Sequence, residues 1–298
     1  MSTMQDTERD TLRRFLFEHA PIRGEAVRLD ASWRAILERH DYPPVVRDVL
    51  GEMMAACALL SSTLKFQGTL TMQIQGNGPV SLMVMEATSE RTLRGMAQWD
   101  ETRLGSGGVR ELLGDGILVI TIDPAQGKER YQGVVEIRGE SLAASLEHYL
   151  AHSEQLDTRL WLAADDQVAA GLLLQRLPGE MNEEERETWE RAGILAHTLT
   201  AQELRDLSGM EVIHRLFHEE DLRVFDPEPV AFRCSCSRER VSDMLRRLGR
   251  DEVRDIIEEQ GAISVTCEFC LHHYRFDRVD AEQLFADYMH TDTAGKPH

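Results

Sequence analysis

Four of the chain's five cysteines stand in two tight pairs late in the sequence. Cys234 and Cys236 form the first pair, in the stretch CSC, and Cys267 and Cys270 form the second, in CEFC. Such pairs serve as disulfides, as a thiol-exchange site or as the ligands of one metal ion. Each use requires a different local fold, so this pattern constrains the end of the chain more than any other feature.

The chain has 298 residues, which is long for one hydrophobic core and favours two domains. It contains no apolar run long enough for a transmembrane helix, and its first residues do not resemble a signal peptide. We therefore expect a cytoplasmic protein, in which the reducing environment disfavours permanent disulfides. The net charge of −19 disfavours nucleic acid and anionic membranes as partners, because both attract basic surfaces.

Residues 1–178 have the pattern of an α+β domain whose strands are mainly antiparallel. Residues 30–64 have helical spacing, and Asp30 is the expected N-cap. Within this stretch an apolar residue recurs every four positions, at Val45, Val49, Met53 and Cys57. We therefore expect Cys57 to be a small core residue with no role in the cysteine site.

After this helix the apolar period changes to two, with Leu70, Met72 and Ile74 alternating with polar residues. The turn GNGP follows, and its Asn-Gly step can supply the positive φ angles of a tight β-hairpin. More strand-like runs continue to residue 178, and Ser141 is the expected cap of a helix over 141–155. No catalytic motif stands out here, so we do not expect an enzyme.

Residues 179–230 differ in composition from the domain before them. The stretch 180–229 holds 14 acidic and 5 basic residues, and its helical pattern has a thin apolar face. Helices with little apolar area depend on docking to another surface, so we expect a helical, metastable linker. An ordinary solvated helical linker is the alternative that the sequence leaves open.

Residues 231–298 carry the four paired cysteines in a module with few large apolar side chains. We expect one helix capped by Ser237, with Met244 and Leu248 facing inward, a second helix ending at Gly261, and a hairpin around CEFC. So small a core usually needs additional stabilisation, such as disulfides or a structural metal. Four thiolates converging on one Zn²⁺ would supply it, so we expect a zinc site at Cys234, Cys236, Cys267 and Cys270.

A thioredoxin-like exchange site at CEFC is the main rival interpretation. That fold places the pair at the start of a helix, whereas the following LHHYRF looks like a strand, and the CSC pair is left unexplained. His272 and His273 are expected to be strand or surface residues, because four cysteines already complete the shell. Zinc keeps the thiols as thiolates, which oxidants attack, and loss of the metal would unfold so small a module.

The stretches CSCSRER and VTCEFCLHHYRF, with GNGP and GLLLQRLP upstream, resemble the 33-kDa heat-shock protein family, the redox-regulated holdase chaperones of bacteria. The resemblance covers nearly the whole chain. It implies a chaperone domain over 1–178, a linker over 179–230 and a zinc switch over 231–298. It also implies that oxidation pairs Cys234 with Cys236 and Cys267 with Cys270, releases zinc, and unfolds the switch and linker.

By the same resemblance, the exposed surface binds unfolding client proteins without ATP, and the protein is a homodimer when oxidised and a monomer when reduced. Two other hypotheses remain open on the residues alone. One is a binding or regulatory protein in which zinc is purely structural, and the other is a thiol oxidoreductase that uses CEFC. Chaperone activity that appears only after oxidation separates the redox-regulated holdase from both of these hypotheses.

Overall fold

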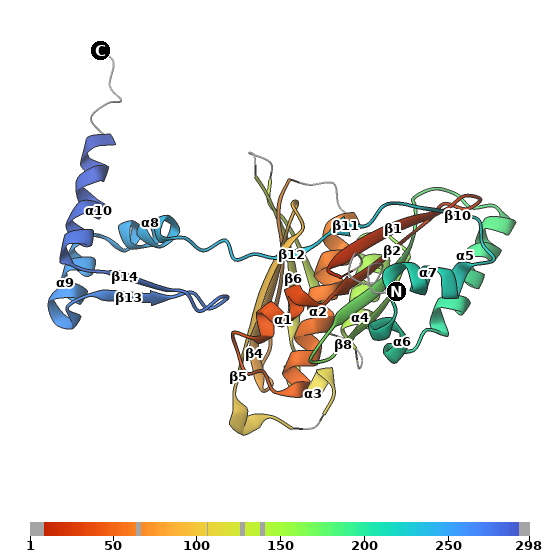
Figure 1. The fold of residues 1–298 in the computed structure, drawn as a ribbon, viewed down its shortest axis with the longest axis horizontal. Coiled ribbons are helices and arrows are strands. Elements are labelled where there is room, and N and C mark those ends of the chain that lie inside the picture. The colour runs from red at the N-terminus through yellow and green to blue at the C-terminus, as the bar shows by residue number, and fades with distance from the viewer. Residues whose placement is uncertain (1–8, 64–66, 106, 126–128, 138–140, 292–298) are drawn as a thin grey trace, which may run out of the picture. The chain divides into compact units, whose positions relative to one another are not determined.

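The computed structural model describes residues 9–63, 67–105, 107–125, 129–137 and 141–291, and Figure 1 shows their arrangement. The chain divides into two compact units, Met1–Arg233 and Cys234–His298. Each unit has its own hydrophobic core.

Two β-sheets form the framework of the first unit. Sheet A has the order β10-β1-β2-β9-β8, with β11 also paired to β1, and sheet B has the order β12-β5-β4-β3-β6-β7. The strands of sheet A are β1 (Thr11–Phe17), β2 (Ile22–Leu29), β8 (Thr158–Ala164), β9 (Ala169–Arg176), β10 (Leu222–Val224) and β11 (Glu228–Pro229). Those of sheet B are β3 (Gly68–Gln75), β4 (Val80–Thr88), β5 (Thr92–Trp99), β6 (Ile117–Pro124), β7 (Tyr131–Glu136) and β12 (Ala231–Phe232).

Neighbouring strands run antiparallel, except that β12 is parallel to β5. The prediction of an α+β fold with mainly antiparallel strands is therefore confirmed. The expected alternation in β3 is confirmed as well, since Leu70, Met72 and Ile74 are fully buried between polar neighbours. Short helices α1 (Ala31–Leu37), α3 (Val109–Leu113) and α4 (Leu142–His152) and the 3-10 turn Glu101–Arg103 complete the framework.

The long helix α2 (Pro44–Thr63) contacts strands of both sheets and forms the centre of the core. Its residues are buried around most of its circumference, which suits a helix enclosed by two sheets. Cys57 lies fully inside this core, as the sequence predicts, and burial raises the pKa of its thiol well above the usual range. This cysteine is thus chemically isolated from the four others.

Two local predictions are wrong in their mechanism. Asp30 precedes α1 but its side chain caps nothing; the carboxylate of Asp10 accepts hydrogen bonds from the amides of Ala31 and Ser32 instead. The turn between β3 and β4 forms without positive φ at Asn77. Its glycines serve close approach, because a Cβ at Gly78 would lie 2.5 Å from the carbonyl oxygen of Leu112.

Three helices cover the face of sheet A that α2 leaves open: α5 (Glu183–His197), α6 (Ala201–Asp206) and α7 (Gly209–Phe217). Each begins with a capping box, in which Asn182, Thr200 and Ser208 accept from the third amide and the glutamate there accepts in return. These paired caps explain why three short helices start where they do in so acidic a stretch.

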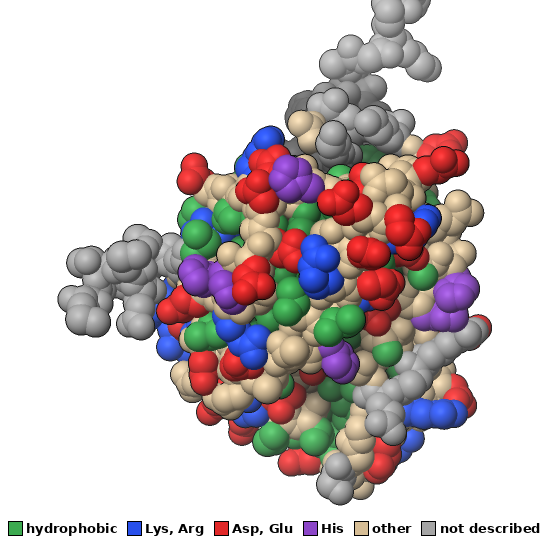
Figure 2. All heavy atoms as spheres, turned by 90° about the vertical axis from the view of Figure 1, so that its right-hand side faces the viewer, with side chains coloured by type: hydrophobic (Ala, Val, Ile, Leu, Met, Phe, Trp, Pro, Cys, Tyr) green, Lys and Arg blue, Asp and Glu red, His purple; other side chains and the backbone are tan. Residues whose placement is uncertain are grey.

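Apolar side chains from both sides fill the interface between these helices and sheet A, which we call the linker cluster. Sheet A contributes Phe15, Phe17, Ile22, Ala26, Ala163, Ala170, Leu172 and Leu174, and the helices contribute Trp189, Ala192, Ala196, Leu204, Val212, Ile213, Leu216 and Phe217. Figure 2 looks onto this side of the molecule and shows many acidic side chains, with basic, histidine and scattered hydrophobic side chains among them.

Beyond α7 the chain forms β10, β11 and β12, which lie along sheet edges. Residues 221–229 run antiparallel to β1, with the amide of Phe225 donating to the carbonyl of Arg14. Ala231 and Phe232 then pair with β5 of sheet B. We call residues 221–233 the strap, because this one segment lines an edge strand of each sheet.

The second unit consists of α8 (Arg238–Leu248), α9 (Arg250–Gln260), the hairpin of β13 (Ile263–Thr266) and β14 (His273–Phe276), and α10 (Arg278–Thr291). Ser237 caps α8 by accepting from the amide of Arg240, and Gly261 ends α9 in the left-handed conformation, both as predicted. Met244 and Leu248 do not face inward: they are 49% and 50% exposed. Only Leu245 of α8 is buried, so this core is smaller than the sequence suggested.

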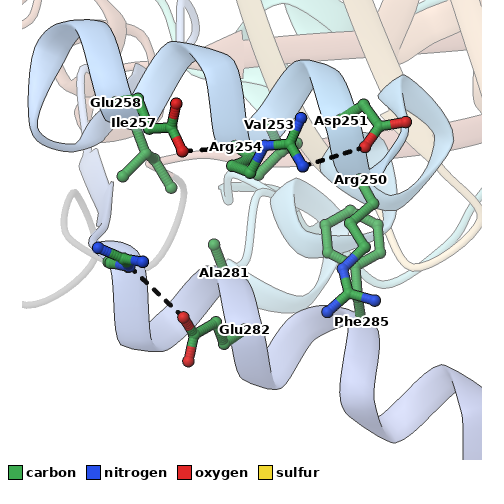
Figure 3. A pocket seen from close by; sticks show the side chains of 10 residues that line it. Arg250, Asp251, Val253, Arg254, Ile257, Glu258, Ala281, Glu282 and Phe285 are labelled. Atoms are coloured by element: carbon green, nitrogen blue, oxygen red, sulfur yellow. Dashed lines mark ion pairs between the residues drawn. The ribbon is translucent and has the colours of Figure 1, made fainter.

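A pocket of about 310 Å³ lies between α9 and α10 (Figure 3). Val253, Ile257 and Phe285 are among its apolar lining. The charged groups at its rim pair with one another, as Arg254 does with Asp251 at 3.5 Å and with Glu258 at 3.9 Å. No cysteine lines this pocket, so the site described next is separate from it.

Candidate metal centre

The four paired cysteines come together within the second unit, in segments outside its helices and strands. Cys234 and Cys236 lie just before α8, whose start is set by the Ser237 cap. Cys267 and Cys270 lie in the loop that joins β13 to β14. That loop is closed by two backbone hydrogen bonds, from the amide of Cys267 to the carbonyl of His272 and from the amide of Leu271 to the carbonyl of Cys267.

The four Sγ atoms all lie within 4.8 Å of one another. The shortest contacts join one cysteine of each pair: Cys234 to Cys267 at 3.7 Å and Cys236 to Cys270 at 3.3 Å. A tetrahedron with metal–sulfur bonds of about 2.3 Å has sulfur–sulfur edges of about 3.8 Å. The thiols therefore already have the spacing that a tetrahedral metal shell requires, and four cysteines so arranged could hold a metal ion.

The surroundings of Cys267 and Cys270 disfavour negative charge on their thiols unless a cation is present. Partial burial raises the pKa of Cys267, and burial together with the neighbouring cysteines raises the pKa of Cys270 to about 12. Metal binding requires all four to be deprotonated. A divalent cation at the centre would supply the missing positive charge, so the group is arranged for a bound ion rather than for free thiolates.

Tyr274 of β14 also belongs to this site, although no cysteine or histidine motif includes it. Its hydroxyl donates a hydrogen bond of 3.1 Å to the Sγ of Cys236, and this bond is the main cause that raises the Tyr274 pKa to about 12. The period-two pattern of HHYRFD places Tyr274 on the inward face of the strand, which is the signal that could have identified it. Hydrogen bonds of this kind orient metal ligands and tune their basicity.

His272 and His273 are exposed and are not part of the four-residue cluster. His273 bonds through Nδ1 to the hydroxyl of Thr266 on the paired strand, at 2.8 Å. The CEFC segment sits in a β-hairpin loop rather than at the start of a helix. The structure therefore does not provide the setting that a thioredoxin-like exchange site needs.

Known proteins resemble this chain over nearly its whole length. Residues 10–277 match the family model described as "Hsp33 protein". The chain is 51% identical over 290 residues to a "33 kDa chaperonin" of Nitrosococcus oceani, covering 97% of this chain and 99% of that protein. The chain belongs to the Hsp33 family. A "33 kDa chaperonin" of Chromobacterium violaceum is 48% identical over 287 residues, with 96% of each chain covered.

The fold is shared with a solved member of the Hsp33 family. The crystal structure of the 33 kDa chaperonin from Thermotoga maritima superimposes with a TM-score of 0.79 at 24% identity, covering 94% of this chain and 99% of that one. Hsp33 proteins are chaperones and not enzymes, so the prediction that the chain is not an enzyme is confirmed. Within the residues that the structure describes, no helix combines the length and apolarity needed to cross a membrane.

Proposed function

We propose that the chain is a redox-regulated, ATP-independent holdase chaperone that is inactive while reduced and zinc-bound. The four-thiol cluster is the observation that carries this proposal. It lies in a small unit whose buried core is limited to a few apolar residues, so the fold of that unit depends on its metal.

Zinc is the metal that this donor set favours, because four thiolates in tetrahedral geometry match its usual structural site. Cys234, Cys236, Cys267 and Cys270 would hold it, with Tyr274 donating to the sulfur of Cys236. The bound ion would keep all four sulfurs deprotonated.

Oxidation is proposed to form the disulfides Cys234–Cys236 and Cys267–Cys270, which the family resemblance implies. Formation of each disulfide transfers two electrons from two cysteine thiolates to the oxidant, either hypochlorite or peroxide, and so removes two thiolate ligands from the metal. Structural zinc contributes about 10–16 kcal/mol of apparent binding free energy, which exceeds the stability expected for a unit of this size. The proposed zinc switch over 231–298 is therefore expected to unfold.

The linker over 179–230 is proposed to loosen with the switch and to uncover the client-binding surface. The linker cluster supports this idea, since α5, α6 and α7 cover an apolar face of sheet A that would attract exposed hydrophobic segments. Partly unfolded polypeptides in the cytoplasm are the proposed clients. The oxidised protein is proposed to form a homodimer, and the reduced protein a monomer.

The test compares the reduced, zinc-loaded protein before and after treatment with hypochlorite, or with peroxide and mild heat. We expect one zinc ion to be released per chain, two disulfides to form, and aggregation of a heat-denatured client to fall only after oxidation. Light scattering combined with size-exclusion chromatography reports the expected change from monomer to dimer. Cys57→Ala is the control, because this buried cysteine lies in the other unit and should leave every readout unchanged.

Complete zinc loss without protection of the client would refute the proposal. It would favour the alternative in which zinc only stabilises a binding or regulatory protein. In that case Cys234→Ser should give simple loss of function, whereas for a redox switch it should weaken zinc retention and regulation.

A further inference from the structure

The strap occupies the positions that an added β-strand would take on both sheets of the first unit. Along β1, the amide of Phe225 donates to the carbonyl of Arg14 and the amide of Val230 donates to that of Asp10. Along β5, the amides of Ala231 and Arg233 donate to the carbonyls of Arg91 and Leu93, at 3.1 and 3.0 Å. Removing the strap would leave these backbone acceptors without partners on two sheet edges.

Side chains of the strap also pack against the first unit and add to these backbone hydrogen bonds. Leu222 and Val224 pack against the linker cluster, Val230 is buried in the main core, and Phe232 lies partly buried against it. The guanidinium of Arg39 stacks over the ring of Phe232 at 4.4 Å from its centre. A segment with alternating apolar residues therefore fits this track.

A charged clasp lies at the point where the strap passes from one sheet to the other. The carboxylate of Glu228 pairs with the guanidinium groups of Arg14 on β1 and Arg91 beside β5. Its side chain is only 20% exposed, so the two arginines hold it in a partly desolvated position. Without the strap, Arg14 and Arg91 would present two positive charges next to the open edges.

The sequences of strap and edges differ in the way expected for a cover and a binding surface. The strap contains Pro227 and Pro229, which cannot donate to a further strand and so block pairing at its outer side. The strands beneath, TLRRFLF in β1 and TLRGMAQW in β5, contain no proline. Open edges of this kind pair readily with other extended chains.

We propose that the strap is an intramolecular stand-in for client: once it is released, extended segments of unfolded proteins add as strands to β1 and β5. The preferred segment has alternating apolar residues and one acidic residue that replaces Glu228 between Arg14 and Arg91. This inference rests on the proposed chaperone function and specifies how clients bind. Main-chain bonds supply affinity for many sequences, as in other cases of strand addition.

The test uses a fluorescent peptide of the strap sequence, DLRVFDPEPVAFR, with the full-length protein. We expect binding to the oxidised protein and much weaker binding to the reduced protein, whose own strap occupies both edges. A second peptide carries N-methyl groups at the positions of Ala231 and Arg233, which keeps all side chains but removes two donors. Losing two hydrogen bonds should weaken binding about thirty-fold.

A pair of variants tests the same contact within the reduced protein. Glu228→Gln should raise hydrogen exchange at the amides of Ala231 and Arg233 about ten-fold, because it removes charge-assisted bonds to two arginines. Asp226→Asn is the matched control, since Asp226 is exposed and makes no hydrogen bond or ion pair with a described residue. The control should exchange as the unmodified protein does.

The outcomes separate this inference from the proposed function. If the oxidised protein protects clients but does not bind the strap peptide, or binds the N-methylated peptide equally well, strand addition is wrong and the chaperone function stands. If the peptide converts the oxidised dimer to monomers without competing with clients, the edges bind a second copy of the chain and the client assignment is overturned. Direct peptide binding is read by fluorescence anisotropy, so it is measured even if chaperone activity is absent.

Discussion

Truncating Phe217 in α7 is expected to open the linker without any oxidant. This side chain is 1% exposed, and its ring contacts those of Phe15 and Phe17 at centroid distances of 5.7 and 5.5 Å. Removing a buried phenylalanine ring typically costs about 3–5 kcal/mol. Because the ring joins a helix of the linker to sheet A, that loss should fall on the docking of α5, α6 and α7.

A loss of this size multiplies the population of the undocked state about 10²- to 10⁴-fold. Hydrogen exchange of amides in α5, α6 and α7 measures this population, and light scattering of a heat-denatured client measures the activity. We expect Phe217→Ala to protect the client while the protein is reduced and keeps its zinc. Phe217→Leu should give a smaller effect in the same direction, so the series stays informative if the alanine variant folds poorly.

Ile194→Ala is the matched control, because Ile194 lies in α5 but is 67% exposed. Its effect should stay within about 0.5 kcal/mol and leave the reduced protein inactive. The reasoning would be refuted if Phe217→Ala accelerated exchange equally in sheet B and in the linker helices. It would also be refuted if the linker opened, zinc stayed bound and the client still aggregated.

Three further outcomes follow from individual side chains. Burial raises the pKa of Glu25 to about 7. Between pH 4.5 and 7 the native state therefore keeps a proton on Glu25 that the unfolded state loses, and the free energy of unfolding falls as pH rises through this range. Glu25→Gln should therefore raise Tm at pH 8 by several degrees and have little effect at pH 4.5; an equal shift at both values would contradict this cause. Tyr274→Phe should weaken zinc binding about ten-fold, measured by chelator competition, because the hydrogen bond to Cys236 is lost. In the native zinc-loaded protein, Cys57 should resist alkylation until denaturant is added, since its thiol is fully buried; labelling at the rate of an exposed thiol would argue against this core position.

Much of the framework could be predicted because its signals are local. The alternation of Leu70, Met72 and Ile74 predicts a strand with one buried face, and the Ser237 cap predicts the start of α8. The cysteine pairs predict a cluster because thiols at such spacing have few uses in a reduced chain. Each of these patterns lies within a few residues, so no knowledge of distant partners is required.

The linker shows where local patterns fail. Treated as one helical stretch, residues 179–230 have a thin apolar face. In the structure the stretch breaks into three short helices, each with its own capping box, and each turns a different set of side chains toward the same sheet. The α7 side chains thus join a cluster whose other half comes from β1, β2, β8 and β9, more than thirty residues away; they are Val212, Ile213, Leu216 and Phe217.

The strap was equally hidden from the sequence. Its strands are two or three residues long, and its partners lie about 140 to more than 200 positions earlier, as in the pairing of Val224 with Phe15. Strands this short have no usable period, and prolines argue against a strand inside a sheet. Only the folded chain reveals that Pro227 and Pro229 belong to an edge.

The linker cluster and the strap together suit the chemistry of an unfolded client. Such a chain exposes apolar side chains, which water solvates poorly, together with backbone groups that lack regular partners. The face of sheet A beneath α5, α6 and α7 offers apolar area, and the edges of β1 and β5 offer backbone partners. Because the continuous segment 179–233 covers both, its release would uncover both kinds of surface at once. Docking it again would displace a client from both, so binding and release would need no ATP.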